Sequence, residues 1–313
     1  MIRYHELPFW GLKVCLSHRS EARQGGGLCT ACGRPAMHGS GQELVDLGDG
    51  RSCCQVCIAF AVFDTAEAMP LFAKVNEFFG SVGLAPATQE QGGHIPLLLV
   101  DSPSLNEQHR AVSNLSGHAH AGSNEWGEHA DHQVYSHTRG LCLAEAGEIQ
   151  TVARSPGLSR MGFSPQWTRR VVRVQEVREV SAILVLFGLP RDLTSSILAH
   201  ELMHAYLRLN KGMPRSIDHQ AEEGLCQLMA YLWLEQGIPI LDADAGLDPS
   251  LAKVRDELRA YFRFQITTDP SEAYGEGFRK ASRAFHAWGL DATLAYVAQH
   301  AKLPDIDPPA VPA

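Results

Sequence analysis

Residues 181–209 read SAILVLFGLPRDLTSSILAHELMHAYLRL, and this stretch decides how the rest of the chain is interpreted. Its first part, Ser181–Gly188, is a continuous apolar run, which predicts a buried strand. The residues after Gly188 break that strand, and Thr194 with the two serines that follow it offers an N-cap. We therefore predict a helix from about Thr194 to Leu209, directly after a buried strand.

The predicted helix carries the pattern H-E-x-x-H at His200, Glu201 and His204. Residues four apart lie on one helix face, so both imidazoles can reach a single metal ion. Glu201 lies one step around the helix, where it can take a proton from metal-bound water. With 15 histidines in 313 residues, composition alone predicts only about 0.05 such patterns. We therefore interpret these residues as a catalytic zinc site, not as two core histidines and a surface glutamate.

A catalytic zinc needs a third protein ligand and an open position for water. The segment Ala221–Gly224 reads AEEG and follows His204 closely enough for a second helix to pass the metal. We favour Glu223 as this ligand and keep Glu222 as the alternative. Hydrolysis also needs a donor to the developing oxyanion, and Tyr274 in the segment AYGEGF is our candidate catalytic donor. The competing interpretation of Tyr274 is a helix-entry residue whose ring packs.

The cysteines are concentrated at the N-terminus, where six of the eight lie within the first 57 residues. Cys29, Cys32, Cys54 and Cys57 form the pattern C-x₂-C-x₂₁-C-x₂-C, which predicts one closed tetrahedral zinc. Cys53 breaks the two-residue spacing, so we treat it as a non-ligand. The sequence thus predicts two kinds of zinc site, one catalytic and at least one structural.

Composition and charge exclude several classes of function. The formal net charge is −8 and the pI is about 6.0, so nucleic acid and anionic lipid are poor partners. The longest apolar runs, such as Ala182–Leu189, are too short to cross a bilayer, and the first residues lack a signal-peptide pattern. We therefore expect a cytoplasmic protein with no membrane contact.

Other segments give coarser predictions. Apolar residues recur at helical spacing over 58–79 with a break near Pro70, and 95–100 reads as a buried strand. A polar, histidine-containing stretch from Gln108 to His137 predicts a long flexible loop. Residues 170–178 alternate like an exposed strand. Further helices are predicted over 216–235, 249–264, 271–287 and 291–301.

Several blocks together resemble one known family. The segments EVSAILVLFGLPRDLTSSILAHELMHAYLRLNKG and AEEGLCQLMAYLWL closely resemble the LIM-domain zinc metallopeptidases of plant organ-size regulation, the "DA-one" family. IPLLLVDSPSLNEQ, TRGLCLAEAGEIQTV and AYGEGFRKA are similar to other blocks of that family, and the N-terminal cysteine segments resemble its LIM-like region. The resemblance covers the chain from about residue 5 to residue 300.

The resemblance implies a zinc peptidase of the gluzincin type that makes limited cuts in protein substrates. His200 and His204 match the family's ligands and Glu201 its catalytic glutamate, whereas the Glu-Glu-Gly match does not choose between Glu222 and Glu223. A protein or peptide substrate and a protein partner for the LIM-like module follow as expectations.

The N-terminus departs from the family pattern. Cys15-x-x-His18 looks like the second half of a further zinc site whose first cysteine pair is missing. A truncated start, an orphaned pair and an incomplete site helped by His5 all remain open. No acidic ubiquitin-interacting helix precedes the LIM-like part, so the family's activation by ubiquitin is not carried over.

The combined prediction is an α+β protein with a small LIM-like zinc module over residues 1–60 and a zincin-like metallopeptidase domain over 61–303. Residues 304–313 form a Pro-rich tail that we expect to be disordered. Two alternatives use the same residues: a non-catalytic zinc-binding adaptor, and a zinc hydrolase of a small amide. The intact Glu201 disfavours the adaptor, because a scaffold needs no base beside its metal.

Overall fold

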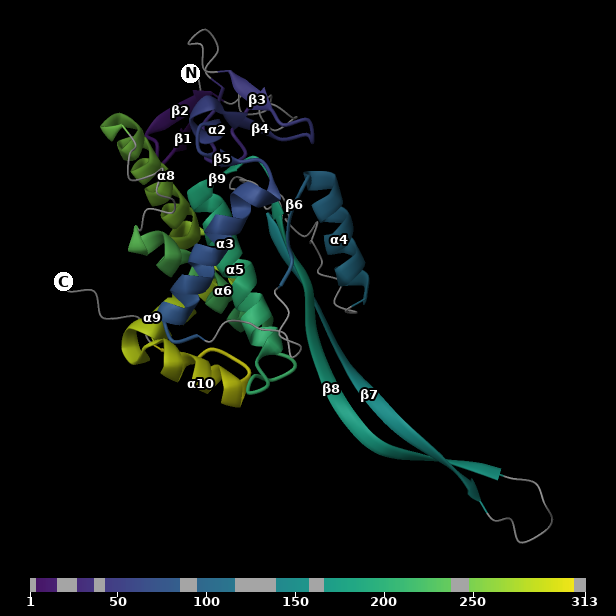
Figure 1. Ribbon diagram of the computed structural model, residues 1–313. Coiled ribbons are helices and arrows are strands. Elements are labelled where there is room, and N and C mark those ends of the chain that lie inside the picture. Colours follow the sequence, from purple (N-terminus) through teal and green to yellow (C-terminus); the bar gives the residue numbers. More distant parts are fainter. Residues whose placement is uncertain are drawn as a thin grey trace.

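The computed structural model mixes helices and sheets, which confirms the α+β class (Figure 1). No helix within its described ranges combines the length and the apolar character needed to cross a bilayer. The residues that the structure describes are 4–15, 27–36, 43–84, 95–115, 139–157, 166–237 and 248–306.

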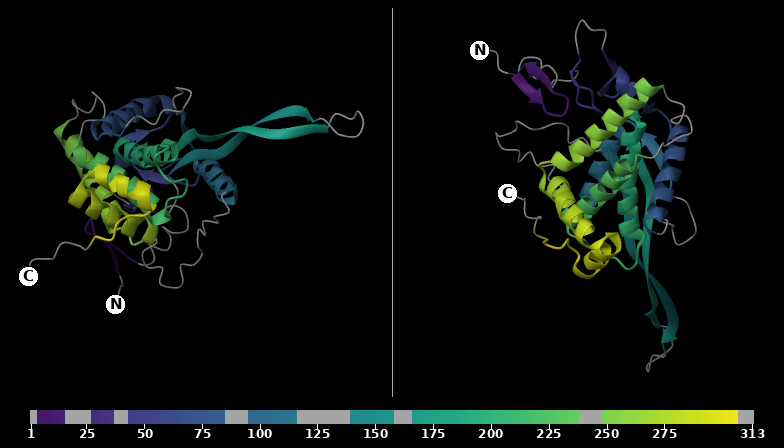
Figure 2. Two further views of the ribbon diagram at one scale, coloured as in Figure 1. Left: turned by 90° about the horizontal axis from the view of Figure 1, so that it is seen from below. Right: turned by 90° about the vertical axis from the view of Figure 1, so that its left-hand side faces the viewer.

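A three-stranded sheet in the order β6-β8-β7 forms the centre of the larger part. β6 (Leu97–Val100) runs parallel to β8 (Gln166–Leu186), and β7 (Gly140–Gly157) pairs antiparallel with β8 along its whole length. The apolar run and the alternating segment before it therefore belong to one strand. Figures 1 and 2 show the far end of the β7–β8 hairpin extending away from the helices.

Helices cover both faces of this sheet. α5 (Arg191–Leu209) packs against β7 and β8, and α4 (Ser102–Leu115) lies on the other side (Figures 1 and 2). The predicted loop from Gln108 to His137 is thus wrong over residues 108–115, which are helical, and residues 116–138 lie outside the described part.

The start of α5 differs from the prediction. The helix begins at Arg191, and Pro190 rather than Thr194 occupies the N-cap position. The Thr194 hydroxyl instead donates to the backbone oxygen of Leu189, inside the first helical turn. Asp192 in that turn accepts two hydrogen bonds from Arg259 of α8 (Pro249–Thr268), so a buried ion pair links the two helices.

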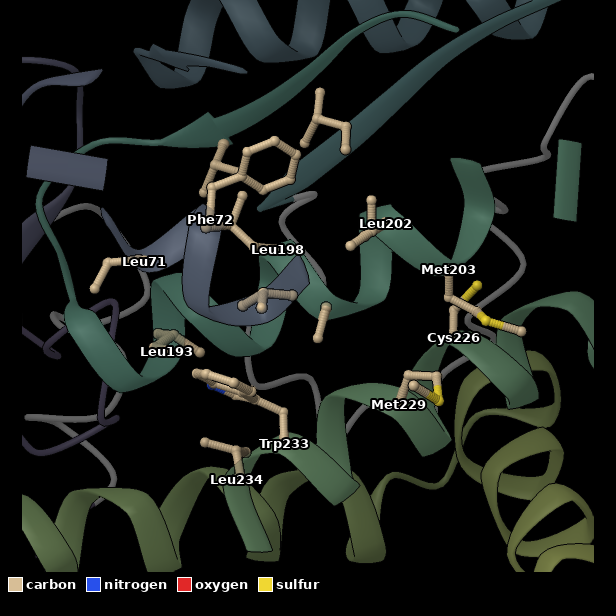
Figure 3. Packing of buried hydrophobic residues seen from close by; sticks show 14 of the residues in the cluster. Leu71, Phe72, Leu193, Leu198, Leu202, Met203, Cys226, Met229, Trp233 and Leu234 are labelled. Atoms are coloured by element: carbon tan, nitrogen blue, oxygen red, sulfur yellow. The ribbon is translucent and has the colours of Figure 1, made fainter. Parts of the chain in front are cut away.

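α6 (His219–Gln236) runs beside α5 and completes the core. Its N-cap is Asp218, whose side chain accepts from the Ala221 N–H, and it ends at Gly237 in the left-handed conformation. Figure 3 shows Leu198 and Leu202 of α5 directed towards Phe72 and the sheet, while Trp233 extends from α6. The two helices are therefore fixed relative to each other by packing as well as by connection.

The predicted break at Pro70 is wrong. α3 (Thr65–Ser81) continues through this residue. A proline inside a helix costs about 3 kcal/mol. Burial of Leu71, Phe72 and Val75 on the helix face that meets the core offsets that cost.

The last predicted helices are present with shifted limits. α8 extends to Thr268, beyond the predicted end at 264. The single helix predicted over 271–287 is divided into a π-helical turn, η1 (Glu272–Glu276), and α9 (Gly277–Trp288). α10 (Leu290–His300) follows as predicted.

Short elements form the N-terminal part. They are β1 (Tyr4–Leu7), β2 (Leu12–Cys15), β3 (Leu44–Asp46), β4 (Ser52–Cys54), α2 (Gln55–Ile58) and β5 (Ala61–Val62), which pairs with β9 (Leu189–Pro190).

This part is attached to the helical body by polar and aromatic contacts. Arg51 donates to the Phe187 backbone oxygen at 2.9 Å, and the ring of Phe9 lies edge-on to that of Tyr261 in α8. Cys15 pairs with Tyr4 in the β1–β2 hairpin, whereas His18 lies outside the described residues.

Candidate active site and metal centres

The four predicted cysteines converge on one point. The sulfur atoms of Cys29, Cys32, Cys54 and Cys57 all lie within 4.8 Å of one another, and three of these residues are buried. The sulfurs of Cys32 and Cys54 are 3.7 Å apart. Four sulfurs bound tetrahedrally to zinc at about 2.3 Å lie about 3.8 Å apart. The cluster therefore has the dimensions of a closed zinc site.

The surroundings of the cluster suit a negatively charged thiolate site. Arg34 donates from Nε to the Cys32 sulfur at 3.2 Å, and its guanidinium lies over the Trp10 ring. Trp10 donates from its indole nitrogen to the Cys32 backbone oxygen at 2.9 Å. Cys53 is not part of this group, and its sulfur lies 3.8 Å from the Gly188 backbone oxygen. It also interacts with the Cys29 side chain, so it borders the cluster without joining it.

The histidines of the H-E-x-x-H pattern face each other from successive turns of α5. The Nε2 atoms of His200 and His204 are 3.2 Å apart. His204 Nδ1 lies 2.9 Å from the Glu222 carboxylate, an acceptor for the Nδ1 proton. That tautomer leaves the Nε2 lone pair free for a metal.

Glu223 of α6 completes a group of three. Its Oε2 lies 3.2 Å from His200 Nε2 and 3.7 Å from His204 Nε2. Ligand atoms at about 2.05 Å in a tetrahedral zinc site are about 3.3 Å apart, close to these distances. Among the residues that the structure describes, none forms a hydrogen bond with this buried oxygen. A buried carboxylate oxygen this close to two imidazole nitrogens fits a cation held by all three groups.

Glu222 contacts the other side of His204 from Glu223. Its Oε1 contacts His204 Nδ1 at 2.9 Å and accepts from Arg208 at 2.6 Å. Burial opposes ionisation, but His204 and then Arg208 hold the pKa of this carboxyl below its usual range. Glu222 therefore orients one histidine from behind. Sequence spacing did not indicate this role, since both glutamates follow the histidines at similar offsets.

A second group of three atoms comes from His200, His204 and Cys226, which also lie within 4.8 Å of one another. Burial raises the pKa of the Cys226 thiol to about 12. A thiol that stays protonated is a poor ligand. Glu223 offers an anionic oxygen beside the same two histidines, so it fits a metal better than Cys226 does.

Glu201 lies beside this group, on the side towards the sheet. It is buried, with 6% of its surface exposed, and burial raises the pKa of its carboxyl. A carboxylate with a raised pKa next to a metal position is suited to accept and return a proton near neutral pH.

Tyr274 approaches the site from the π-helical turn. Its ring is nearly parallel to that of His200, with centroids 6.3 Å apart, and 37% of its surface is exposed. His219, which sequence reasoning did not single out, has its Nδ1 3.9 Å from Glu223 Oε1 and its ring 6.4 Å from that of Tyr274. Both side chains thus border the position between the two histidines and Glu223.

Glycines allow η1 to come this close. A Cβ on Gly275 would collide with the Asp269 backbone oxygen. Gly224 of α6 and Gly277 meet backbone to backbone, and neither has room for a side chain. The segment around Tyr274 is therefore held against α6 by contacts that only glycine permits.

The fold and the two groups of ligands define an α+β protein with two candidate metal centres, one of four cysteines and one on paired helices. The profile of the family described as "DA1-like: Protein DA1" matches residues 90–300. The chain belongs to this DA1 family of plant organ-size regulators.

Curated relatives agree with this assignment. The chain is 35% identical to "Protein DA1-related 1" of Arabidopsis thaliana over 95% of its own length and 51% of the relative. The chain is 34% identical to "Protein DA1" of the same plant, over 97% of its own length and 54% of the relative. It is 36% identical to "LIM domain-containing protein HDR3" of Oryza sativa subsp. japonica, over 95% of its own length and 57% of the relative. The chain thus spans about half the length of these relatives. No solved structure matches it.

Proposed function

We propose that this protein is a zinc-dependent peptidase that makes limited cuts in protein substrates. The observation that carries the proposal is the buried Glu223 Oε2, which lies 3.2 Å from the Nε2 atom of His200 and 3.7 Å from that of His204. This arrangement supports a zincin-like domain with a glutamate as third zinc ligand. The four-cysteine cluster would hold a second, structural zinc in the LIM-like module.

The protein's own groups have separate tasks in this reaction. Zinc held by His200, His204 and Glu223 would act as a Lewis acid on the substrate carbonyl and the attacking water. Glu201 takes the proton of that water and returns it to the leaving nitrogen. Tyr274 donates a hydrogen bond from its hydroxyl to the oxygen on which negative charge develops.

An extended peptide is the substrate form that suits the surroundings. Within the described sheet β7 is an edge strand, and α5 packs against it. A substrate segment added along this edge would pass the metal position as a further strand. We propose that the LIM-like module contacts a protein partner. We also propose the cytoplasm as the site of action, because closely spaced cysteines that bind metal need a reducing compartment.

Cleavage of a protein substrate library tests this function. The wild type is expected to produce defined fragments, and Glu201→Gln none, while both bind zinc and melt at similar temperatures. Glu235→Gln, an exposed change at the far end of α6, serves as the matched control. Equal cleavage by Glu201→Gln would contradict the proposal. Zinc binding without any hydrolysis by the wild type would favour the adaptor, and hydrolysis of small amides alone would favour the amide hydrolase.

A further inference from the structure

The first residue of β7 lies directly against the proposed catalytic base. A Cβ placed on Gly140 would be 2.6 Å from Glu201 Oε1, 2.9 Å from Glu201 Cγ and 2.5 Å from Ile197 Cγ2. Side-chain atoms do not approach this closely, so any side chain at this position must displace its neighbours. Its nearest neighbours are Glu201 and the residue one turn before it on α5.

A second contact reaches Glu201 from the same strand. The backbone N–H of Cys142 donates a hydrogen bond to the Glu201 carboxylate. Residues 140 and 142 are alternate positions of one strand, so both contacts come from the same stretch of backbone. The carboxylate is almost fully buried, so these contacts and the helix itself determine where its oxygens lie.

The backbone just before Gly140 is fixed by the cysteine module. The Arg139 guanidinium donates to the Thr30 backbone oxygen at 3.0 Å, and Thr30 lies between Cys29 and Cys32. The Arg139 backbone oxygen accepts from the N–H of Leu186 in β8 at 3.0 Å. The contact with the cysteine module and the contact with Glu201 therefore come from adjacent residues, Arg139 and Gly140.

We propose that Gly140 and Cys142 are positioning residues for Glu201, and that the four-cysteine module holds this part of β7 in place through Arg139. The catalytic part of this inference rests on the proposed peptidase function. The structural part does not depend on that function. It states that β7 fixes the position of the Glu201 carboxylate through a steric contact and a hydrogen bond.

The expected consequence of adding one methyl group follows from the distances. Gly140→Ala must move the Glu201 carboxylate by roughly 1 Å, and a displacement of that size costs about 10²-fold in turnover. Zinc content should stay unchanged, because Gly140 does not contact His200, His204 or Glu223 among its nearest atoms. The loss should appear in kcat, with KM nearly constant.

A double-mutant cycle in melting temperature tests the contact without any activity. Gly140→Ala is expected to lower the melting temperature by about 5 °C in the wild type. In a Glu201→Ala background the loss should fall to about half or less, because the clash with the carboxylate is gone. Gly80→Ala in α3, where a Cβ meets nothing within 4 Å, is the matched control and should cost nothing.

The outcomes separate the two claims. An equal temperature loss in both backgrounds would overturn the positioning role, whatever the enzyme does. A non-additive cycle with no peptide cleavage by the wild type would keep the contact and reject the peptidase. A non-additive cycle with full turnover in Gly140→Ala would show that the displacement has no catalytic effect, which also overturns the inference.

The role of the four-cysteine module in holding β7 is tested with the variant Cys54→Ser. Its turnover is measured on a short peptide substrate that is too small to contact the module. We expect this variant to keep one zinc and to lose at least tenfold in kcat. Unchanged kcat with one zinc lost would overturn the link from the module to Glu201. Should the variant fail to fold, the Gly140 cycle still decides whether β7 positions the base.

Discussion

Truncating Glu222 tests the division of labour between the two adjacent glutamates. Glu222→Ala removes the acceptor 2.9 Å from His204 Nδ1 and leaves Arg208 without its 2.6 Å partner, but it keeps all three proposed ligands. Loss of such an orienting carboxylate lowers metal affinity about 10- to 100-fold, which corresponds to about 1.4–2.8 kcal/mol. Glu223→Ala removes a ligand and should weaken binding much further.

The assay is competition for zinc with a chromophoric chelator at neutral pH, on protein whose four-cysteine site stays filled. Glu235→Ala, on the exposed end of the same helix, is the control and should bind as the wild type does. The expected order of affinity is wild type, then Glu222→Ala, then Glu223→Ala. The reverse order of the two variants would refute the geometry, since it would make Glu222 the ligand.

Three further changes have expected outcomes. Asp192→Ala leaves the buried Arg259 guanidinium with only its longer, 3.9 Å pair to Asp256 and should cost about 3–5 kcal/mol of unfolding free energy in urea titrations; a loss below 1 kcal/mol would contradict it. Tyr274→Phe should lower kcat about 10²-fold with zinc content unchanged, and unchanged turnover would remove it from the mechanism. Burial opposes ionisation of Asp49, yet Arg51 holds the pKa of that carboxyl below its usual value. Its stabilising effect is therefore present above about pH 4 and lost as pH falls through the lowered pKa. Asp49→Asn should lower the melting temperature at pH 7, and this loss should shrink steadily as the pH falls below about 4.

Much of the site could be predicted because it depends on local spacing. An i, i+4 pair of histidines on a helix converges whatever surrounds it. Each C-x₂-C pair likewise brings its own two sulfurs together, and two such pairs in one module are a recognised zinc pattern. The α+β class also followed from local signals, since the apolar run before His200 forms the buried part of β8.

The choice between Glu222 and Glu223 could not follow from sequence. Consecutive helix residues point about 100° apart, so the rotation of α6 against α5 decides which one faces the metal position. That rotation depends on core packing and on the close approach of Gly224 to Gly277, both of which are tertiary.

Several predicted limits of helices and strands are wrong for similar, tertiary reasons. The hydroxyl residues Thr194–Ser196 predicted an N-cap, but α5 starts about one turn earlier. Asp192 in its first turn is held by Arg259 from α8, a contact between distant parts of the sequence. The pairing of β7 with β8 was not predicted, since the sequence of residues 140–157 has no strong alternation. The π-helical turn at Tyr274 brings Gly275 against the Asp269 backbone, a tertiary contact that spacing does not reveal.

The helical metal centre is tested by the zinc content per chain, measured by elemental mass spectrometry on the wild type and on His204→Ala. We expect about two zinc ions in the wild type and about one in the variant, with the four-cysteine zinc retained. An unchanged zinc content in folded His204→Ala would mean that His204 is not a ligand and that the helical site is not a metal centre.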